Sequence, residues 1–252
     1  MKKNIKYSIL GVIAGAMLAS CETDPETGLV RLTHYATFDL TGGEIYSVPV
    51  GGSYSEPGVV CMEGTEDISD KVKTTIYDIS GQVVNSIKTD EITFYNVEYS
   101  AVNVDGFSSS ATRTVFIYNP EVKSSCAGTF AVDMDNTTYN GSSILAAATA
   151  RGYKTEAKIN ITELCPGIFY TNDFLAGWYE QMRGIGASYA MYGYFKLNPD
   201  NTIELMYSHV NGWNDGLDYI ANGKWDEENG ILSYESSYAE GVIMINPVLI
   251  RQ

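Results

Sequence analysis

The sequence predicts an all-β protein made of two antiparallel β domains with one short helix. From Leu32 onward, short runs of β-branched and aromatic residues alternate with clusters of Gly, Asn, Asp and Ser, a spacing typical of strands and turns. The 252 residues are 44% hydrophobic and include 19 tyrosines, a composition of folded chains. A break at Asn119-Pro120-Glu121 divides the pattern, because proline cannot continue a strand ladder. We therefore expect one domain over residues 32–119 and another over 120–252.

The first residues have the pattern of an export signal. Three lysines precede the apolar run Ile9 to Ala19, which is shorter than the ~20 residues that span a bilayer but suits a secretory signal. Leu18-Ala19-Ser20-Cys21 resembles the bacterial lipobox, in which the cysteine is diacylated and becomes the mature N-terminus. The resemblance implies a signal peptide over residues 1–20, lipidation at Cys21 and an acidic tether over 21–31. The alternative is an ordinary signal peptide that ends in a cysteine.

The charge of the chain argues against two classes of partner. It carries 16 basic and 31 acidic residues, and cleavage before Cys21 would take the net charge from −15 to −18 by removing three lysines. Such a surface repels phosphate backbones, so we expect no nucleic-acid partner. It also repels anionic headgroups, so we expect membrane attachment through the acyl chains on Cys21 alone.

Cysteine and histidine are too few for a typical Cys/His metal site, and we expect no metal and no cofactor. The chain has only His34 and His209, and three cysteines besides Cys21. Cys61 lies in an apolar run and is expected to be buried. One disulfide is possible in an oxidising compartment, and Cys126 with Cys165 is the favoured pair.

Three strands are predicted in the first domain, over residues 72–77, 92–99 and 111–118. Asn103-Val104-Asp105-Gly106 supplies the hairpin turn before the last of them, because Asp-Gly tolerates the positive φ of tight turns.

Sequence motifs over residues 36–118 resemble bacterial immunoglobulin-like (Ig-like) modules. The motifs are Ser53-Tyr54-Ser55-Glu56-Pro57-Gly58, Val97-Glu98-Tyr99-Ser100-Ala101, Val104-Asp105-Gly106 and Thr112-Arg113-Thr114-Val115. The resemblance implies an Ig-like sandwich in which Tyr99 buries its ring and bonds to backbone, as in a tyrosine corner. Many relatives carry an acidic loop after Pro-Gly. Here that loop includes Glu63 to Asp67, where solvated acids are favoured over a calcium site.

The second domain is predicted to be an antiparallel β-sandwich or open barrel of six to eight strands. The expected strands cover residues 158–164, 189–197, 203–208, 220–225, 230–234 and 241–250. The alanine-rich segment 143–150 is the expected helix.

This half resembles the C-terminal β domains of Bacteroidota surface lipoproteins encoded with starch-utilisation-type glycan uptake systems. The hairpin Gly223-Lys224-Trp225-Asp226 with Gly230-Ile231-Leu232-Ser233-Tyr234 carries the resemblance, and it also recurs in lipocalin-like domains. The acids after Cys21 resemble the surface-export signal of that phylum. The resemblance implies an outer-membrane lipoprotein at the cell surface, with an outer-membrane transporter complex as a possible partner.

Enzymatic signatures are weak, and we expect no enzyme. There is no Gly-x-Ser-x-Gly elbow, and the two histidines fall in different predicted domains. Acidic pairs lie on turn-like segments, where they are usually solvated. A glycoside hydrolase without familiar motifs is the remaining enzymatic alternative.

Three clusters have the composition of a sugar-binding site, which pairs aromatic platforms with planar amides or carboxylates: residues 173–179, residues 209–216, and the tyrosines at 189, 192 and 194. The expected glycan-binding residues are Asp173, Trp178, Tyr179, Trp213, Asn214 and Asp215. For both tryptophans the alternative is a place in the core. Trp225 is expected to be a packing residue, and the tyrosines at 189, 192 and 194 a core face or barrel lining.

Two functions remain open from the sequence. The favoured one is a non-catalytic glycan-binding accessory module, with the first domain as a spacer between the membrane and the second. The alternative is a structural or interaction lipoprotein with no small ligand, because an Ig-like fold fits either role.

Overall fold

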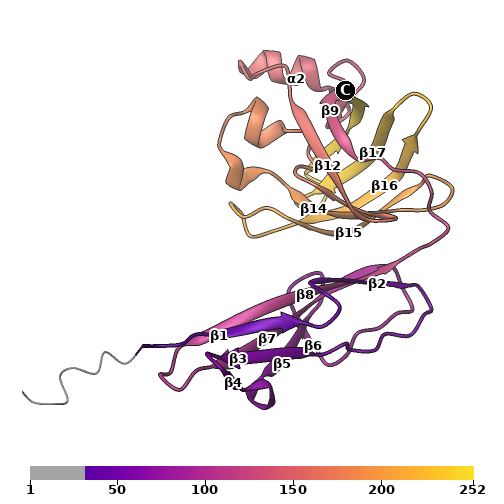
Figure 1. Cartoon of the computed structure of the whole chain (residues 1–252). Coiled ribbons are helices and arrows are strands. Elements are labelled where there is room, and N and C mark those ends of the chain that lie inside the picture. The colour runs from indigo at the N-terminus through magenta and orange to yellow at the C-terminus, as the bar shows by residue number, and fades with distance from the viewer. Residues whose placement is uncertain (1–31) are drawn as a thin grey trace, which may run out of the picture.

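The computed structural model describes residues 32–252 and shows two β domains joined end to end (Figure 1). The all-β fold class is confirmed. The predicted signal peptide, the lipidation site Cys21 and the tether lie outside the described residues. Within residues 32–252, no helix has the length and apolar character needed to cross a membrane.

The N-terminal domain is a sandwich of two sheets. One sheet has the order β1-β3-β4 and the other β2-β8-β7-β5-β6, and β2 runs parallel to β8 while the other pairs are antiparallel. The strands are β1 (Ala36–Leu40), β2 (Ile45–Pro49), β3 (Val59–Glu63), β4 (Glu66–Asp67), β5 (Lys73–Tyr77), β6 (Val83–Val84), β7 (Thr93–Val102) and β8 (Ser108–Tyr118). A 3₁₀ turn covers Ser69–Lys71.

The predicted hairpin joins β7 to β8, and Gly106 has the positive φ (+86°) that the turn requires. Alternate residues of β7 point inward, so that Tyr95, Val97 and Tyr99 pack against Val115 and Ile117 of β8. Cys61 is buried as predicted.

The C-terminal domain is a barrel. Its strands are β9 (Gly128–Val132), β10 (Thr138–Tyr139), β11 (Ser142–Ser143), β12 (Lys158–Cys165), β13 (Ile168–Thr171), β14 (Tyr192–Leu197), β15 (Ile203–His209), β16 (Leu217–Asp226), β17 (Ile231–Tyr238), β18 (Ile243–Asn246) and β19 (Val248–Arg251). Antiparallel ladders connect β16-β17-β19-β9-β12-β13-β14-β15 in that order. The short strands β10, β11 and β18 extend the sheet beyond β17.

The barrel closes between β15 and β16 without a regular ladder. Isolated bridges join Thr202 to Lys224 and Val210 to Asp215, and the backbone N–H of Leu217 donates to Ser208 Oγ at 2.8 Å. At Gly223 a Cβ atom would lie 2.3 Å from the Ile203 side chain, so the close approach of the two strands needs glycine. The domain is therefore an open barrel, one of the two predicted forms.

Two segments depart from their predicted form. The apolar stretch 241–250 is two strands, β18 and β19, because Pro247 has no N–H and separates the part that pairs with β10 from the part that pairs with β9. A π-helical turn, Trp178–Met182, is absent from the predicted elements. The helix α2 (Ile144–Arg151) forms as predicted, with Ser143 as N-cap and Gly152 in the left-handed conformation at its end.

Aromatic and aliphatic side chains fill the barrel interior. Phe130, Phe169, Phe195 and Trp225 are fully buried there. The indole N–H of Trp225 donates to Ser124 Oγ at 3.0 Å, and its ring contacts Phe130, as expected for a packing residue.

Cys126 and Cys165 are both buried but do not form the favoured disulfide. Cys126 lies in the barrel core, while Cys165 lies in a separate cluster against the first domain. Burial raises the pKa of the Cys165 thiol to about 12, so the thiolate that disulfide chemistry needs is disfavoured.

That separate cluster joins the two domains. Phe94 and Phe116, near one end of β7 and β8, pack with Cys165 and Ile168 of the β12–β13 hairpin. The rings of Phe94 and Tyr194 meet edge to face at 4.9 Å. The apolar contact positions the barrel at the end of the Ig-like domain reached by the last residues of β8.

Candidate ligand-binding surface

Trp213 lies at the tip of the β15–β16 hairpin and is 40% exposed. The bridge between Val210 and Asp215 closes this turn, and the N–H of Asn214 donates to Val210 O at 2.9 Å. Asn214 adopts a positive φ of +52°, which asparagine tolerates better than most residues. Asn214 and Asp215, the next two residues in the chain, are also exposed.

Three tyrosines hold the Trp213 ring in place. Tyr179 meets it edge to face at 4.7 Å, Tyr189 is tilted at 4.8 Å, and Tyr238 is stacked at 5.9 Å. A Cβ atom at Gly212 would lie 2.5 Å from the Tyr189 ring, so the backbone approaches that tyrosine only because residue 212 is glycine. We call Trp213, Tyr179, Tyr189 and Tyr238 the aromatic cluster. The fold thus brings together Tyr179 and Trp213 from the two predicted segments.

Trp178 is buried, which corrects its prediction as a platform for sugars. Tyr139 stacks on its ring at 4.3 Å, Tyr153 meets it at 5.6 Å, and the Arg151 guanidinium lies 5.8 Å from its centroid. These neighbours cover the faces that a sugar would use. Trp178 is a packing residue that supports the adjacent Tyr179.

Asp173 is also buried, which corrects its prediction as a sugar-binding carboxylate. Its Oδ1 accepts hydrogen bonds from the N–H groups of Leu175 (2.8 Å) and Met191 (3.2 Å), while its Oδ2 has no partner among the described residues. Burial raises the pKa of Asp173 to about 7, although these hydrogen bonds act in the opposite direction. Asp173 therefore ties the segment before Tyr179 to the residue that precedes β14.

The predicted tyrosine stripe lies on the outside of the barrel rather than in its core. On β14, Tyr192 and Tyr194 are half-buried and alternate with the buried Gly193 and Phe195. Tyr194 contacts Phe94 of the first domain, so part of this outer face belongs to the domain junction. The third tyrosine, Tyr189, belongs to the aromatic cluster instead.

An open groove lies near the aromatic cluster, and none of the six residues predicted to bind a glycan lines it. It has a volume of about 880 Å³ and is lined by charged side chains at 154, 156, 158 and 180, and by Gly186 and Ala187. The loop that supplies Gly186 and Ala187 continues directly to Tyr189 of the cluster. Its wall comes from segments far apart in the sequence, so no local motif marks it.

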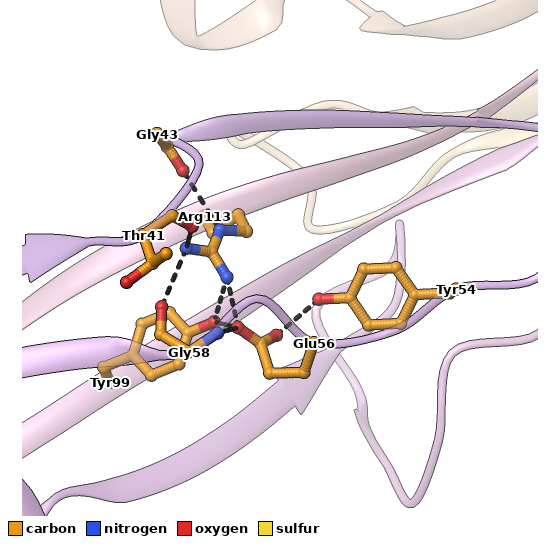
Figure 2. A network of polar contacts seen from close by, with 7 residues as sticks. All are labelled: Thr41, Gly43, Tyr54, Glu56, Gly58, Tyr99 and Arg113. Carbon is orange, nitrogen blue, oxygen red and sulfur yellow. Dashed lines mark hydrogen bonds and ion pairs between the residues drawn. The ribbon is translucent and has the colours of Figure 1, made fainter.

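The motifs of the Ig-like domain meet around one buried arginine (Figure 2). Arg113 pairs with Glu56 and donates to the backbone oxygens of Thr41 (2.6 Å), Gly43 (3.0 Å) and Gly58 (3.1 Å). Tyr99 buries its ring as predicted, but its hydroxyl donates to Glu56 at 2.6 Å rather than to backbone. The motif is therefore structural: it fixes the loop around Glu56 to β7 and β8.

The pKa values of Glu56 and Tyr99 in this network depend on burial, on hydrogen bonds and on neighbouring charges. Burial alone would raise the pKa of Glu56, but hydrogen bonds from Tyr54 and Tyr99, together with the Arg113 charge, hold it below its usual range. Burial and the Glu56 carboxylate raise the pKa of Tyr99. The carboxylate is thus ionised and the phenol neutral at neutral pH.

The acidic side chains around the loop after β3 make hydrogen bonds and an ion pair with neighbouring residues. Asp67 accepts from Ser69 N (2.9 Å) and Ser69 Oγ (2.6 Å), Glu63 accepts from Val104 N at 3.1 Å, and Glu66 lies 3.8 Å from Lys71. Over residues 32–252, no group of three or more His, Cys, Asp or Glu side chains is arranged to hold a metal ion.

Comparison with known proteins bears on both domains. A family model for the C-terminal domain of BT2262-like proteins matches residues 119–251, more than half of the chain. The chain belongs to the BT2262-like family. A second model, the bacterial surface protein Ig-like domain, matches residues 38–117, in agreement with the resemblance seen in the motifs.

A solved structure is also similar to this member of the BT2262-like family. The lipoprotein BT2262 from Bacteroides thetaiotaomicron is 30% identical over 86% of this chain and all of its own chain, with a TM-score of 0.44. No functionally curated protein matches. The Ig-like model describes a domain of bacterial surface proteins, and the similar solved structure is that of a lipoprotein. Neither of the two matched families is a known enzyme family.

Proposed function

We propose that the chain is a non-catalytic glycan-binding module of a nutrient uptake system, anchored in the outer membrane through acyl chains on Cys21. The observation that carries the proposal is Trp213, whose ring is exposed on a support of three tyrosines with Asn214 and Asp215 beside it. A sugar needs a flat apolar ring for its C–H face and planar polar groups for its hydroxyls, and these residues supply both.

Preorganisation supports a binding role for this surface. The ring contacts to Tyr179, Tyr189 and Tyr238 restrict Trp213 before a ligand arrives, so little side-chain entropy is lost on binding. A single exposed platform supports modest affinity, with a Kd of ~10⁻³ to 10⁻⁵ M, or about 4–7 kcal/mol.

The groove of about 880 Å³ extends the proposed site. Lys154, Glu156, Lys158 and Glu180 line it, and all four side chains can hydrogen-bond to hydroxyl groups. A chain of several sugars would lie in the groove with one ring on Trp213. The net charge of −15 favours neutral glycans over acidic ones.

A glycan array with the mature chain tests the proposal. We expect binding by the unmodified chain and at least a tenfold loss with Trp213→Ala. Tyr35→Ala is the matched control, because Tyr35 is a 57% exposed aromatic residue in the other domain. Equal binding by the unmodified chain and Trp213→Ala would place any glycan site elsewhere, and no binding to any glycan would contradict the proposal.

The second candidate function is a structural or interaction lipoprotein without a small ligand. It is favoured by the filled barrel interior, where Phe130, Phe169, Phe195 and Trp225 occupy the space that ligand-carrying barrels leave open. Co-purification of the intact chain with an outer-membrane transporter, and no glycan binding, would support this second function.

A further inference from the structure

Five large apolar side chains are exposed together at one end of the Ig-like domain. They are Leu32 (71% exposed), Tyr35 (57%), Val102 (56%), Val104 (74%) and Phe107 (48%). We call this group the apolar tip. Single apolar residues are common on protein surfaces, but a group at one place marks an interaction surface.

Contacts between the chain entering the domain and the β7–β8 hairpin hold the group together. The rings of Tyr35 and Phe107 lie 5.5 Å apart. The Asn103 side chain donates to His34 O at 2.7 Å, which ties the entering chain to the hairpin. Leu32 and Tyr35 therefore lie on the same end of the domain as Val104 and Phe107.

The hairpin presents these side chains on a well-bonded turn. Asn103 N donates to Phe107 O at 3.0 Å, and Phe107 N donates to Asn103 Oδ1 at 2.7 Å. The N–H of Val104 donates to the Glu63 carboxylate at 3.1 Å. These hydrogen bonds satisfy backbone groups of the turn and fix its conformation. The side chains of Val104 and Phe107 remain outside the domain core.

The position of the tip along the chain identifies what it faces. Leu32 follows Cys21 by eleven residues, a stretch that spans at most about 40 Å when fully extended. In Figure 1 the N-terminal chain reaches the domain at the start of β1, and the barrel lies beyond the other end of β8. A lipid on Cys21 would therefore be attached on the side of the tip, with the barrel as the more distant domain.

We propose that the apolar tip is a membrane-contact surface that enters the lipid interface beside the acyl anchor and orients the protein with its barrel away from the membrane. The proposal rests on the lipid anchoring included in the proposed function. Tyr35 has the amphipathic ring that favours the membrane–water interface, and the other four side chains add apolar area.

The charged residues at the apolar tip predict which lipid headgroups it contacts. Asp105 belongs to the turn and Glu63 contacts the backbone of Val104, whereas Arg31 stands next to Leu32 in the sequence, so these two acids and one arginine do not form a basic cluster. Negative lipid headgroups would repel these acids. Contact is therefore expected with zwitterionic lipids and is expected to weaken as anionic lipid is added.

The test uses the mature chain with its tether, with Cys21 replaced by a hexahistidine tag that binds nickel-chelating lipid in phosphatidylcholine vesicles. This attachment does not need acylation. An environment-sensitive fluorophore is placed by Val104→Cys or, as the matched control, by Val242→Cys, a valine of similar exposure (67%) in the barrel domain. Cys61, Cys126 and Cys165 are buried and remain unlabelled in the folded chain.

We expect quenchers carried on vesicle lipids to reduce the Val104→Cys signal severalfold more than the Val242→Cys signal. Adding Phe107→Ser to the Val104→Cys chain should reduce that difference. Equal quenching at the two positions would overturn the proposal. Shielding of the Val104 label that rises with protein concentration in the absence of vesicles would also overturn it, since the tip would then contact a second copy.

These outcomes are independent of the glycan site. Trp213→Ala should leave the lipid quenching at Val104 unchanged, and Phe107→Ser should leave glycan-array binding unchanged. Absence of glycan binding by the unmodified chain, with membrane contact intact, would contradict only the proposed ligand. Failure of the native chain to be acylated at Cys21 would contradict the proposed anchor and the membrane-contact role of the tip that rests on it, but not the glycan site.

Discussion

Arg113 in the Ig-like domain and Asp173 in the barrel are both fully buried, yet their surroundings differ in the hydrogen bonds that they supply. Arg113 meets one carboxylate, one phenol and three backbone oxygens, whereas one oxygen of Asp173 has no partner among the described residues. A buried charge is stable only where every polar atom is satisfied. The difference teaches that the first site stabilises a charge, whereas the second favours the protonated acid below about pH 7.

The largest expected effect is that of Arg113→Met. This variant removes the charge partner of the Glu56 carboxylate and the Arg113 donor to the backbone oxygens of Thr41, Gly43 and Gly58. We therefore expect unfolding of the Ig-like domain to become easier by about 5 kcal/mol. Denaturant titration of the whole chain measures this loss. A loss below about 1 kcal/mol would mean that the network does not stabilise the domain.

Asp173→Asn tests whether the buried Asp173 makes the free energy of unfolding depend on pH. The folded pKa of about 7 lies above the ordinary value of 3.8, so folding favours the protonated acid. The stability that this group contributes is fully present below about pH 4 and is lost as pH rises through about 7, by up to about 4 kcal/mol. Tyr234, whose pKa is raised well above its usual value by burial, stays neutral across this range.

Denaturant midpoints at pH 4.5 and 7.5 measure this effect. The amide that replaces the carboxyl group cannot ionise, so the stability of Asp173→Asn relative to the unmodified chain should increase with pH. The Glu180 charge also raises the pKa of Asp173, and Glu180→Gln controls for its contribution. The same stability difference at both pH values would show that Asp173 ionises freely in the folded protein.

Tyr99→Phe removes one member of the Arg113 network while keeping its ring. Its hydroxyl donates to Glu56 at 2.6 Å and accepts from Arg113 at 2.9 Å, so we expect a loss of about 2 kcal/mol. Tyr77→Phe is a suitable control, because the Tyr77 hydroxyl donates to Glu98 outside this network. In thermal unfolding, the midpoint temperature of Tyr99→Phe should be clearly lower than that of Tyr77→Phe.

The smallest effect is expected from Lys71→Ala. Lys71 and Glu66 form an ion pair at 3.8 Å, but their side chains are 56% and 73% exposed. Solvent screens such pairs, so the change in unfolding free energy should be under about 0.5 kcal/mol. A loss as large as that of Tyr99→Phe would mean that this exposed ion pair stabilises the domain as much as a hydroxyl group of the buried Arg113 network does.

Local patterns were enough to predict much of the fold. The helix at 143–150, the β7–β8 hairpin and most strands followed from alanine content, from Asp-Gly and from alternation of side chains, all of which act over a few residues. Pro247 could have signalled the break in the last apolar stretch, because its missing N–H is itself a local property. The π-helical turn and the barrel seam carry no such signal.

The candidate site was only partly predictable. Trp178 and Trp213 have the same side chain and both follow a glycine, yet Tyr139 and Arg151 cover one, while the hairpin tip exposes the other. The surroundings of Asp173 likewise depend on the segment just before β14, where the Met191 N–H reaches its carboxylate. These neighbours come from distant parts of the chain, and residue spacing does not encode their distance.

The sequence by itself determined that this protein is all-β and acidic, that its two halves differ in kind, and that its first domain carries the motifs of a bacterial Ig-like module. Only the tertiary structure decided that these motifs surround Arg113, that the tyrosine stripe lies outside the barrel, and that apolar residues 32, 35, 102, 104 and 107 share one exposed end. The physical reason is range: propensity and alternation act between neighbours in the chain, whereas burial and charge pairing depend on neighbours in space.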